Sequence, residues 1–239
     1  MHAPAVYRAI LLALLATLVP SGAQAGGFSV LPTRIQFSAE RGVQSVLLTN
    51  TSAQTVSVES QVLVWPEGAP GQLASDVVVT PAVVTLPPGQ RMRVRVGLLR
   101  AGDGKAERAY RLYFTELPAP TPLQGAGIGV RLQLGLPVFV APRERQPQAL
   151  QWRRLPQREG SDVPLLEVFN PGNVHANLVQ ARVASGADQW PLNLTGLYVL
   201  AGLRLQVSLP QELAARNEAW QVRWMDGEDA REAAVAPKP

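Results

Sequence analysis

Hydrophobic and polar residues alternate in short runs along most of the chain. The clearest run, RMRVRV at residues 91–96, places Met92, Val94 and Val96 on one side and three arginines on the other. A period of two is typical of a β-strand with one buried face. Similar runs are separated by clusters of Gly, Pro, Asn and Ser, and the helical period is weak almost everywhere. The pattern therefore predicts an all-β protein.

The runs fall into two series. The first contains seven strand-like runs in about 115 residues, the number that an immunoglobulin-like sandwich uses. They include one run at Phe28–Phe37 and, in DVVVTPAVVTLPPGQ at 76–90, a strand broken by a proline turn. The charged, proline-containing segment RERQPQ then indicates a linker at 143–148. A second, less regular series follows, with one helical turn expected at Gln211–Arg216. We predict two immunoglobulin-like β-sandwich domains, at 26–142 and 149–233. The closing segment REAAVAPKP is expected to be frayed, with the tail proper at 234–239.

The first 25 residues are predicted to be a signal peptide. His2 and Arg8 lie in a short polar head, an apolar run follows at Ala9–Val19, and AQA ends at Ala25. This layout is typical of a secretory signal that is cleaved after Ala25. The run is too short to span a membrane, and no later stretch approaches the roughly 20 apolar residues that a span requires. We expect an exported protein that is not embedded in a membrane.

Composition narrows the function further. The sequence has no cysteine, which excludes disulfides, thiol nucleophiles and metal-thiolate sites. The net charge is +4 and almost all of the positive charge is arginine, whose planar fork suits carboxylates and phosphates. These arginines are dispersed and few aromatic residues lie between them, so nucleic acid is not the expected partner.

No catalytic centre is recognisable. Gly125, Gly127 and Gly129 are spaced G-x-G-x-G and lead into a strand, whereas a dinucleotide loop needs G-x-G-x-x-G before a helix. His175 is the only histidine after the signal peptide, and beside a turn it is expected to form a structural hydrogen bond. The acidic segment DGED at 226–229 suggests a hairpin turn. We predict no enzyme activity, no metal, no cofactor and no small-molecule substrate.

The last run of the first series has the strongest functional pattern. In GIGVRLQLGLP, Ile128, Val130, Leu132 and Leu134 share one face of the predicted strand. Soluble proteins normally protect an exposed sheet edge with charge, proline or a bulge, and here only Arg131 precedes Pro137. Such an edge suits the addition of a strand from a partner protein. An ordinary terminal strand with its apolar face inward, or a surface module that exposes a long edge, would show the same alternation.

Several segments together make the chain similar to the PapD-like family of periplasmic pilus chaperones, most closely its non-classical, archaic-like branch. These segments are PTRIQF at 32–37, VTPAVVTLPPGQRMRVRV at 79–96, YRLYFTELP at 110–118, RLQLGLPVFVAP at 131–142, EVFNPGNVHANL at 167–178 and YVLAG at 198–202. No single segment is decisive, but their order and spacing are specific. The resemblance covers most of the mature chain and is densest in the first domain.

The resemblance implies a mechanism. A pilus subunit is an incomplete sandwich that lacks its last strand, and the chaperone lends its own edge strand to the open groove. Ile128, Val130, Leu132 and Leu134 are then the donor residues. The expected partners are pilin or fimbrial subunits and an outer-membrane usher, and the expected location is the periplasm. A better-fitting strand from the next subunit displaces the donor, so no ATP is required.

The family also holds the C-terminal carboxylate of the subunit between its two domains. Arg34 in PTRIQF matches an arginine that serves this purpose. Other members supply a second anchor, a lysine on the donor strand, but Pro137 stands at that position here. Arg111 and Arg131 are candidates to replace the lysine, because they lie on nearby strands. Ala141 stands where other members have an arginine, so the ion pairing between the domains is expected to differ.

The sequence leaves three other classes of protein as alternatives. An exported immunoglobulin-like surface or adhesion module is the main alternative, although it would have no need for Arg34 in a cleft or for a bare donor edge. A pilin subunit would normally be a single incomplete domain with its own donor extension, which two β series do not match. An exported enzyme is disfavoured because the sequence offers no nucleophile, base or metal cluster.

Overall fold

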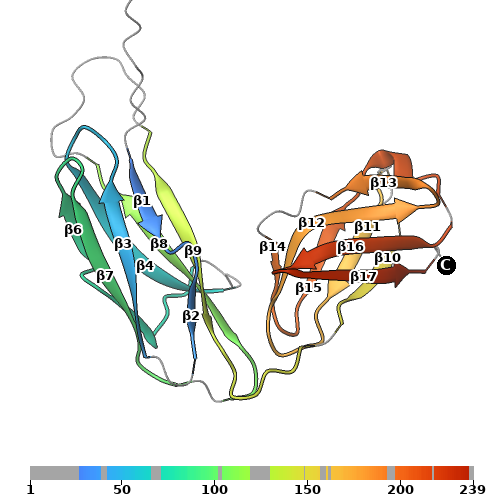
Figure 1. Cartoon of the computed structure of the whole chain (residues 1–239), viewed down its shortest axis with the longest axis horizontal. Helices are drawn as coiled ribbons and strands as arrows, with labels where there is room; N and C mark the ends of the chain where they lie inside the picture. The colour runs from blue at the N-terminus through green and yellow to red at the C-terminus, as the bar shows by residue number, and fades with distance from the viewer. Residues whose placement is uncertain are drawn as a thin grey trace, which may run out of the picture.

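A computed structural model gives the fold of most of the chain. It describes residues 27–38, 42–65, 71–101, 104–118, 130–147, 149–156, 160, 163–192, 197–216 and 218–236. Within these ranges the chain forms strands and one short 3-10 helix, arranged as two β-sandwiches (Figure 1). The prediction of an all-β protein with two sandwich domains is confirmed. None of the described helical segments is long and apolar enough to cross a membrane.

The described residues of the first domain form nine strands in two sheets. The strands are β1 (Phe28–Leu31), β2 (Ile35–Phe37), β3 (Val43–Asn50), β4 (Val56–Trp65), β5 (Val77–Thr80), β6 (Val83–Leu86), β7 (Arg91–Leu98), β8 (Arg108–Glu116) and β9 (Gln133–Val140). One sheet has the order β1-β3-β7-β5 and the other β2-β9-β8-β4-β6. Apolar residues at alternate positions fill the space between the sheets, including Val46, Val94, Leu112 and Phe114, all 0% exposed.

Two predicted strands are each divided between the sheets. The run Phe28–Phe37 was expected to be one strand, but it breaks at Pro32 into β1 and β2, which belong to opposite sheets. The broken strand expected around Pro81 likewise becomes β5 and β6, one in each sheet. A proline has no N–H for a ladder and its ring fixes φ, so the chain turns at both places. As a result, β2 lies beside β9.

In the second domain, the residues that the structure describes form eight strands. They are β10 (Gln151–Leu155), β11 (Leu165–Phe169), β12 (Ala176–Ser185), β13 (Asp188–Pro191), β14 (Leu197–Val199), β15 (Arg204–Ser208), β16 (Trp220–Asp226) and β17 (Asp229–Val235). The sheet β10-β11-β15 packs against a sheet of order β13-β12-β16-β17, in which β14 also pairs with β12. The expected helical turn is η1 (Gln211–Leu213), and it buries Leu213 in the core.

The end of the chain differs from the sequence prediction. The segment REAAVAPKP was expected to be frayed, but residues up to Val235 form β17, which pairs with β16 from Asp226↔Asp229 to Trp220↔Val235. Val235 is 0% exposed, so an apolar residue near the terminus closes the core of the second domain. The turn DGED joins β16 and β17 as a hairpin, as predicted, with Gly227 at φ 65°.

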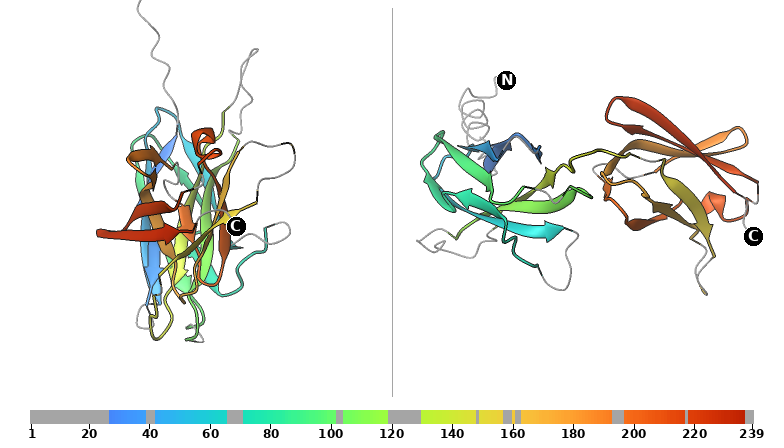
Figure 2. Two further views of the ribbon diagram at one scale, coloured as in Figure 1. Left: turned by 90° about the vertical axis from the view of Figure 1, so that its right-hand side faces the viewer. Right: turned by 90° about the horizontal axis from the view of Figure 1, so that it is seen from below.

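The two sandwiches lie next to each other and are joined at one end by the linker (Figures 1 and 2). The predicted signal peptide, Gly125, Gly127 and Ile128 lie outside the described residues. The structure therefore describes the donor strand from Val130 onward, together with both sides of the junction between the domains.

Candidate functional site

Strand β9 is paired along its whole length on one side but only along part of its length on the other. Along its whole length it pairs with β8, from Arg108↔Val140 to Thr115↔Gln133. On its other side β2 covers only Val138 to Val140, in parallel register. On the side away from β8, the stretch Gln133–Pro137 therefore has no neighbouring strand among the described residues. This stretch is a free sheet edge, and we call it the β9 edge.

The direction of the main-chain groups shows what the β9 edge offers. The Leu132 carbonyl accepts a hydrogen bond from the Glu116 N–H on the β8 side, at 2.9 Å. Successive residues of a strand direct their main-chain groups to opposite sides, so Gln133 and Gly135 direct theirs away from β8. Pro137 has no N–H, and it lies where that group would have faced the unpaired side. The β9 edge therefore presents N–H and C=O groups at Gln133 and Gly135 to a further strand.

The side chains named as donors follow the same strand out of the core. Leu136 is buried, Leu134 and Leu132 are partly buried and pack against the core cluster of the first domain, and Val130 is 85% exposed. The apolar face thus begins as part of the protein's own core and becomes increasingly accessible towards Val130. Ile128, the fourth residue named, lies outside the described residues.

Two arginines flank Pro137 on the outer face of the sheet. The parallel register Ile35↔Val138 places the preceding residue, Arg34, beside Pro137, and Arg111 is paired directly with Pro137 on the other side. Paired residues of neighbouring strands face the same way, and strands lie about 4.8 Å apart, so the two arginine Cα atoms are about 10 Å apart across Pro137. We call Arg34 and Arg111 the arginine pair.

The surroundings of the arginine pair leave its charge available. Arg34 is exposed, and neither arginine forms an ion pair with a carboxylate in the described part of the chain. The Arg111 guanidinium lies 3.9 Å from the ring centroid of Trp65, which fixes its orientation by a cation–π contact. Arg131, the other candidate, is six positions before Pro137 and hence about 20 Å away along the strand. The fold brings Arg34 and Arg111 together and leaves Arg131 apart.

An aromatic cluster next to the arginine pair joins the two domains. Phe139 of β9 stacks on His175 of the second domain, with ring centroids 3.8 Å apart and an interplanar angle of 15°. Tyr198 lies 5.3 Å from Phe139 and 5.7 Å from Trp65 by the same measure. Phe139 is 0% exposed although it projects from the outer face of its sheet, because the second domain covers it. Trp65 therefore contacts both the arginine pair and the second domain.

A buried polar contact fixes the same junction. The Nδ1 atom of His175 lies 2.6 Å from Glu107 Oε2, and the backbone N–H of His175 donates to the same oxygen at 2.8 Å. The His175 side chain is 8% exposed and that of Glu107 is 2% exposed. His175 therefore has the structural hydrogen bond that its place beside a turn suggested. Sequence patterns had singled out His175 but not Glu107, because a single glutamate in a loop carries no periodic signal.

The linker is also held in place. The side chain of Asn173 donates to the carbonyl of Glu144 at 2.8 Å and to the carbonyl of Lys105 at 3.0 Å, and its Oδ1 accepts the Gln146 N–H at 2.7 Å. One asparagine of the second domain thus bonds both the predicted linker and a loop of the first domain. Together with the His175 contact, these bonds restrict the angle between the domains.

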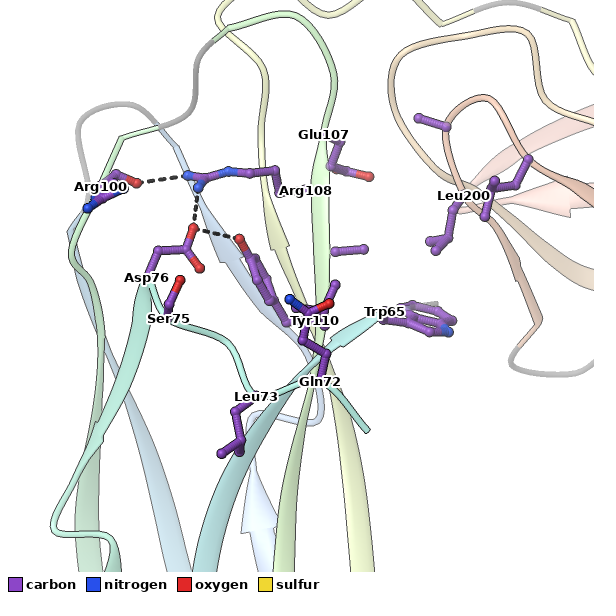
Figure 3. Close-up of a pocket in the computed structure, with 14 residues that line it drawn as sticks. Trp65, Gln72, Leu73, Ser75, Asp76, Arg100, Glu107, Arg108, Tyr110 and Leu200 are labelled. Atoms are coloured by element: carbon purple, nitrogen blue, oxygen red, sulfur yellow. Dashed lines mark hydrogen bonds and ion pairs between the residues drawn. The ribbon is translucent and has the colours of Figure 1, made fainter. Parts of the chain in front are cut away.

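A cavity of about 440 Å³ lies between the end of the first sandwich and Leu200–Leu203 of the second (Figure 3). On its wall, Asp76 pairs with the Arg108 guanidinium and accepts a hydrogen bond from the Tyr110 hydroxyl at 2.7 Å. Burial, and then the hydrogen bond to Asp76, raise the pKa of Tyr110 above its usual range. The charge of the Asp76 carboxylate is thus already compensated by Arg108 of the same chain. The contacts of Asp76 in this cavity wall are structural, and they hold the start of β5 to β8.

Comparison with known proteins gives a consistent result. A family model described as pili and flagellar-assembly chaperone, PapD N-terminal domain, matches residues 27–146. No match was found among the curated protein sequences.

Solved structures of fimbrial chaperones share the fold of both domains. The CsuC–CsuE chaperone–tip adhesion subunit complex of the archaic Csu pili of Acinetobacter baumannii matches with a TM-score of 0.65, at 17% identity over 89% of this chain and 100% of that chain. The CupB2 chaperone of Pseudomonas aeruginosa matches with a TM-score of 0.61, at 16% identity over 87% and 100%. The Salmonella enterica SafA pilin–SafB chaperone complex matches with a TM-score of 0.61, at 15% identity over 88% and 96%.

Proposed function

The chain belongs to the PapD-like family of pilus-assembly chaperones, and we propose that it acts in the periplasm by lending the β9 edge to pilus subunits. The observation that carries this proposal is the free stretch Gln133–Pro137, which offers main-chain groups to a further strand and carries an apolar face that leads out of the core. Solved complexes of similar chaperones contain a tip adhesion subunit in one case and a pilin in another, which supports subunits as partners.

The β9 edge is suited to hold a subunit that lacks a strand. Main-chain hydrogen bonds at Gln133 and Gly135 give affinity that does not depend on the partner's sequence. Val130, Leu132 and Leu134, with Ile128 before them, fill successive pockets of the subunit groove. Val130 is 85% exposed, so its burial contributes about 2 kcal/mol, and the partly buried leucines contribute less.

The arginine pair is suited to hold the C-terminal carboxylate of the subunit. The strand register places Arg34 and Arg111 on either side of the uncharged Pro137, and in this proposal their two guanidinium groups hold one carboxylate between them. Charge-assisted hydrogen bonds of this kind are short and directional. Trp65 keeps Arg111 in place, so little side-chain entropy is lost on binding. In this proposal Arg111 replaces the lysine that other family members carry at the position of Pro137.

Release follows from the same geometry. Strand pairing along an edge is reversible, so a donor strand from the next subunit displaces β9 if it fills the groove better. The exchange requires no ATP, because one set of strand contacts replaces another. We place this exchange at an outer-membrane usher, to which the chaperone delivers its subunit.

The experiment is co-expression with the pilus subunits encoded nearby, followed by isolation of the complex from the periplasm. We expect a 1:1 complex with the unaltered chaperone and degradation of the subunit without it. Val130→Asp should abolish the complex, because a carboxylate would enter an apolar groove. The matched control is Val163→Asp, at a residue that is 40% exposed in the second domain. Protection of the subunit by Val130→Asp to the same extent as by the control would contradict the proposal.

A further inference from the structure

The sheet β1-β3-β7-β5 has an outer face on which three arginines lie in a row. Arg91, Arg93 and Arg95 are alternate residues of β7 and all three are exposed. Alternate residues of a strand are about 7 Å apart, so their guanidinium groups form a continuous basic stripe. This stripe is on the other sheet from β9, and in Figure 1 β7 is separated from the second domain by the rest of the first sandwich.

Among the described residues, the stripe has no acidic counterpart on its own face of the sheet. Across β3 the three arginines are paired with Thr49, Leu47 and Ser45, and on the other side Thr80 of β5 is paired with Arg95. None of the described residues on this face is acidic, and none forms an ion pair with the three arginines. By contrast, several arginines elsewhere contact carboxylates, namely Arg108, Arg153, Arg204, Arg216, Arg223 and Arg231.

Exposed aliphatic side chains accompany the arginines on the same face. Leu31, at 66% exposure, is paired with Leu47, which in turn is beside Arg93. Val43 at 62% and Val78 at 41% flank Gly97 at one end of the stripe. The face therefore combines positive charge with apolar groups that are largely exposed in the described part of the protein.

We propose that this face binds the surface of a membrane that contains anionic phospholipids. Arginine forks suit lipid phosphates, and the aliphatic side chains can enter the interface between headgroups and acyl chains. A flat sheet with one sign of charge suits a lipid surface, because lipids move laterally and need no fixed register. Bound in this way, the protein would keep the β9 edge, which is on the other sheet, open to the periplasm.

The expected size of the effect follows from the charge. Each Lys or Arg near an anionic surface contributes about fivefold to affinity, so three together contribute roughly 100-fold. Because the interaction is between exposed charges, it should weaken when the salt concentration is raised.

The test is co-sedimentation of the mature chain with vesicles. We expect binding to vesicles of phosphatidylcholine with phosphatidylglycerol, and little binding to phosphatidylcholine alone. The triple variant Arg91→Gln, Arg93→Gln, Arg95→Gln should bind the anionic vesicles roughly 100-fold more weakly. The control carries the same change of charge elsewhere, as Arg143→Gln, Arg145→Gln, Arg182→Gln, and should bind much as the unaltered protein does. Thermal unfolding of both variants verifies that they are folded.

Two results would overturn the proposal. One is the absence of binding to anionic vesicles at low salt, and the other is an equal loss in both triple variants, which would indicate attraction by net charge alone. Adding polyglutamate identifies the remaining alternative. If polyglutamate binds the stripe while the vesicles do not, the face recognises an acidic protein segment instead of lipid.

Discussion

At the scale of single residues, the register of β2, β9 and β8 decides between candidates that the sequence leaves open. The resemblance already singled out Arg34, but Arg111 and Arg131 were both candidates for the second anchor, and no spacing along the chain distinguishes these two. Only strand pairing shows that Arg34 and Arg111 flank Pro137 while Arg131 is far along the strand. The contact of Arg111 with Trp65 was also unpredictable, because it joins two strands that are distant in sequence.

The arginine pair predicts how carboxylate binding responds to substitution. Arg34→Ala and Arg111→Ala should each lower the affinity for a subunit, or for its C-terminal peptide, about 10- to 100-fold. Each substitution removes a charge-assisted hydrogen bond to the carboxylate. Isothermal titration calorimetry with the free peptide and with its C-terminally amidated form measures this. Amidation of the peptide should lower its affinity for the unaltered protein by a similar factor, and should lower its affinity for the two variants much less. Arg131→Ala is the control, and a loss there as large as at Arg111 would refute the assignment.

The contact between Glu107 and His175 makes a second prediction at this scale. Glu107→Gln should lower the free energy of unfolding by about 1–3 kcal/mol, because it weakens a buried hydrogen bond to a charged acceptor. His175→Phe keeps the stacking on Phe139 but removes the hydrogen bond between the His175 ring and Glu107. Denaturant unfolding of both single variants and the double variant forms a thermodynamic cycle. Losses that simply add in the double variant would show that the two side chains do not stabilise the junction through each other.

At the scale of strands, alternation identifies the elements but not the sheets to which they belong. The pattern predicted one strand at Phe28–Phe37 and a broken strand around Pro81, but it did not show that the two halves of each belong to opposite sheets. Sheet membership depends on contacts across the sandwich, which a period of two does not encode. The prediction that the closing segment is frayed was wrong for a related reason. Its alternation in REAAV is weak, and β17 is held by pairing with β16 and by burial of Val235.

The β9 edge predicts an effect of proline at one position. Gln133→Pro should leave the free energy of unfolding nearly unchanged, because the Gln133 N–H is directed away from β8. It should nevertheless weaken subunit binding about tenfold, since it removes one of the main-chain donors that the β9 edge offers to a strand of the subunit. The Gln133 side chain donates to Thr115 at 2.9 Å, so Gln133→Ala controls for that loss. Equal binding by the proline and alanine variants would mean that no strand adds at this edge.

At the scale of the whole molecule, the two domains act together at one site. The β9 edge belongs to the first domain, but Phe139 and Trp65 beside it pack against Tyr198 of the second. Asn173 and His175, in the loop before β12, form hydrogen bonds to the linker and to Glu107 of the first domain. The sequence predicted two sandwiches, a linker and the donor strand. The way that the linker and the domains lock together depends on side chains from four separate segments, so only the folded structure shows it.

The most direct test of the account is amide hydrogen exchange of the chaperone, alone and in a 1:1 complex with a pilus subunit. The account predicts that the amides of Gln133 and Gly135 exchange quickly in the free protein and become strongly protected in the complex. The amides of β8, which are already paired, should change little. Protection that instead appears on β6 or β17, with Gln133 and Gly135 still exchanging quickly, would contradict strand addition at the β9 edge.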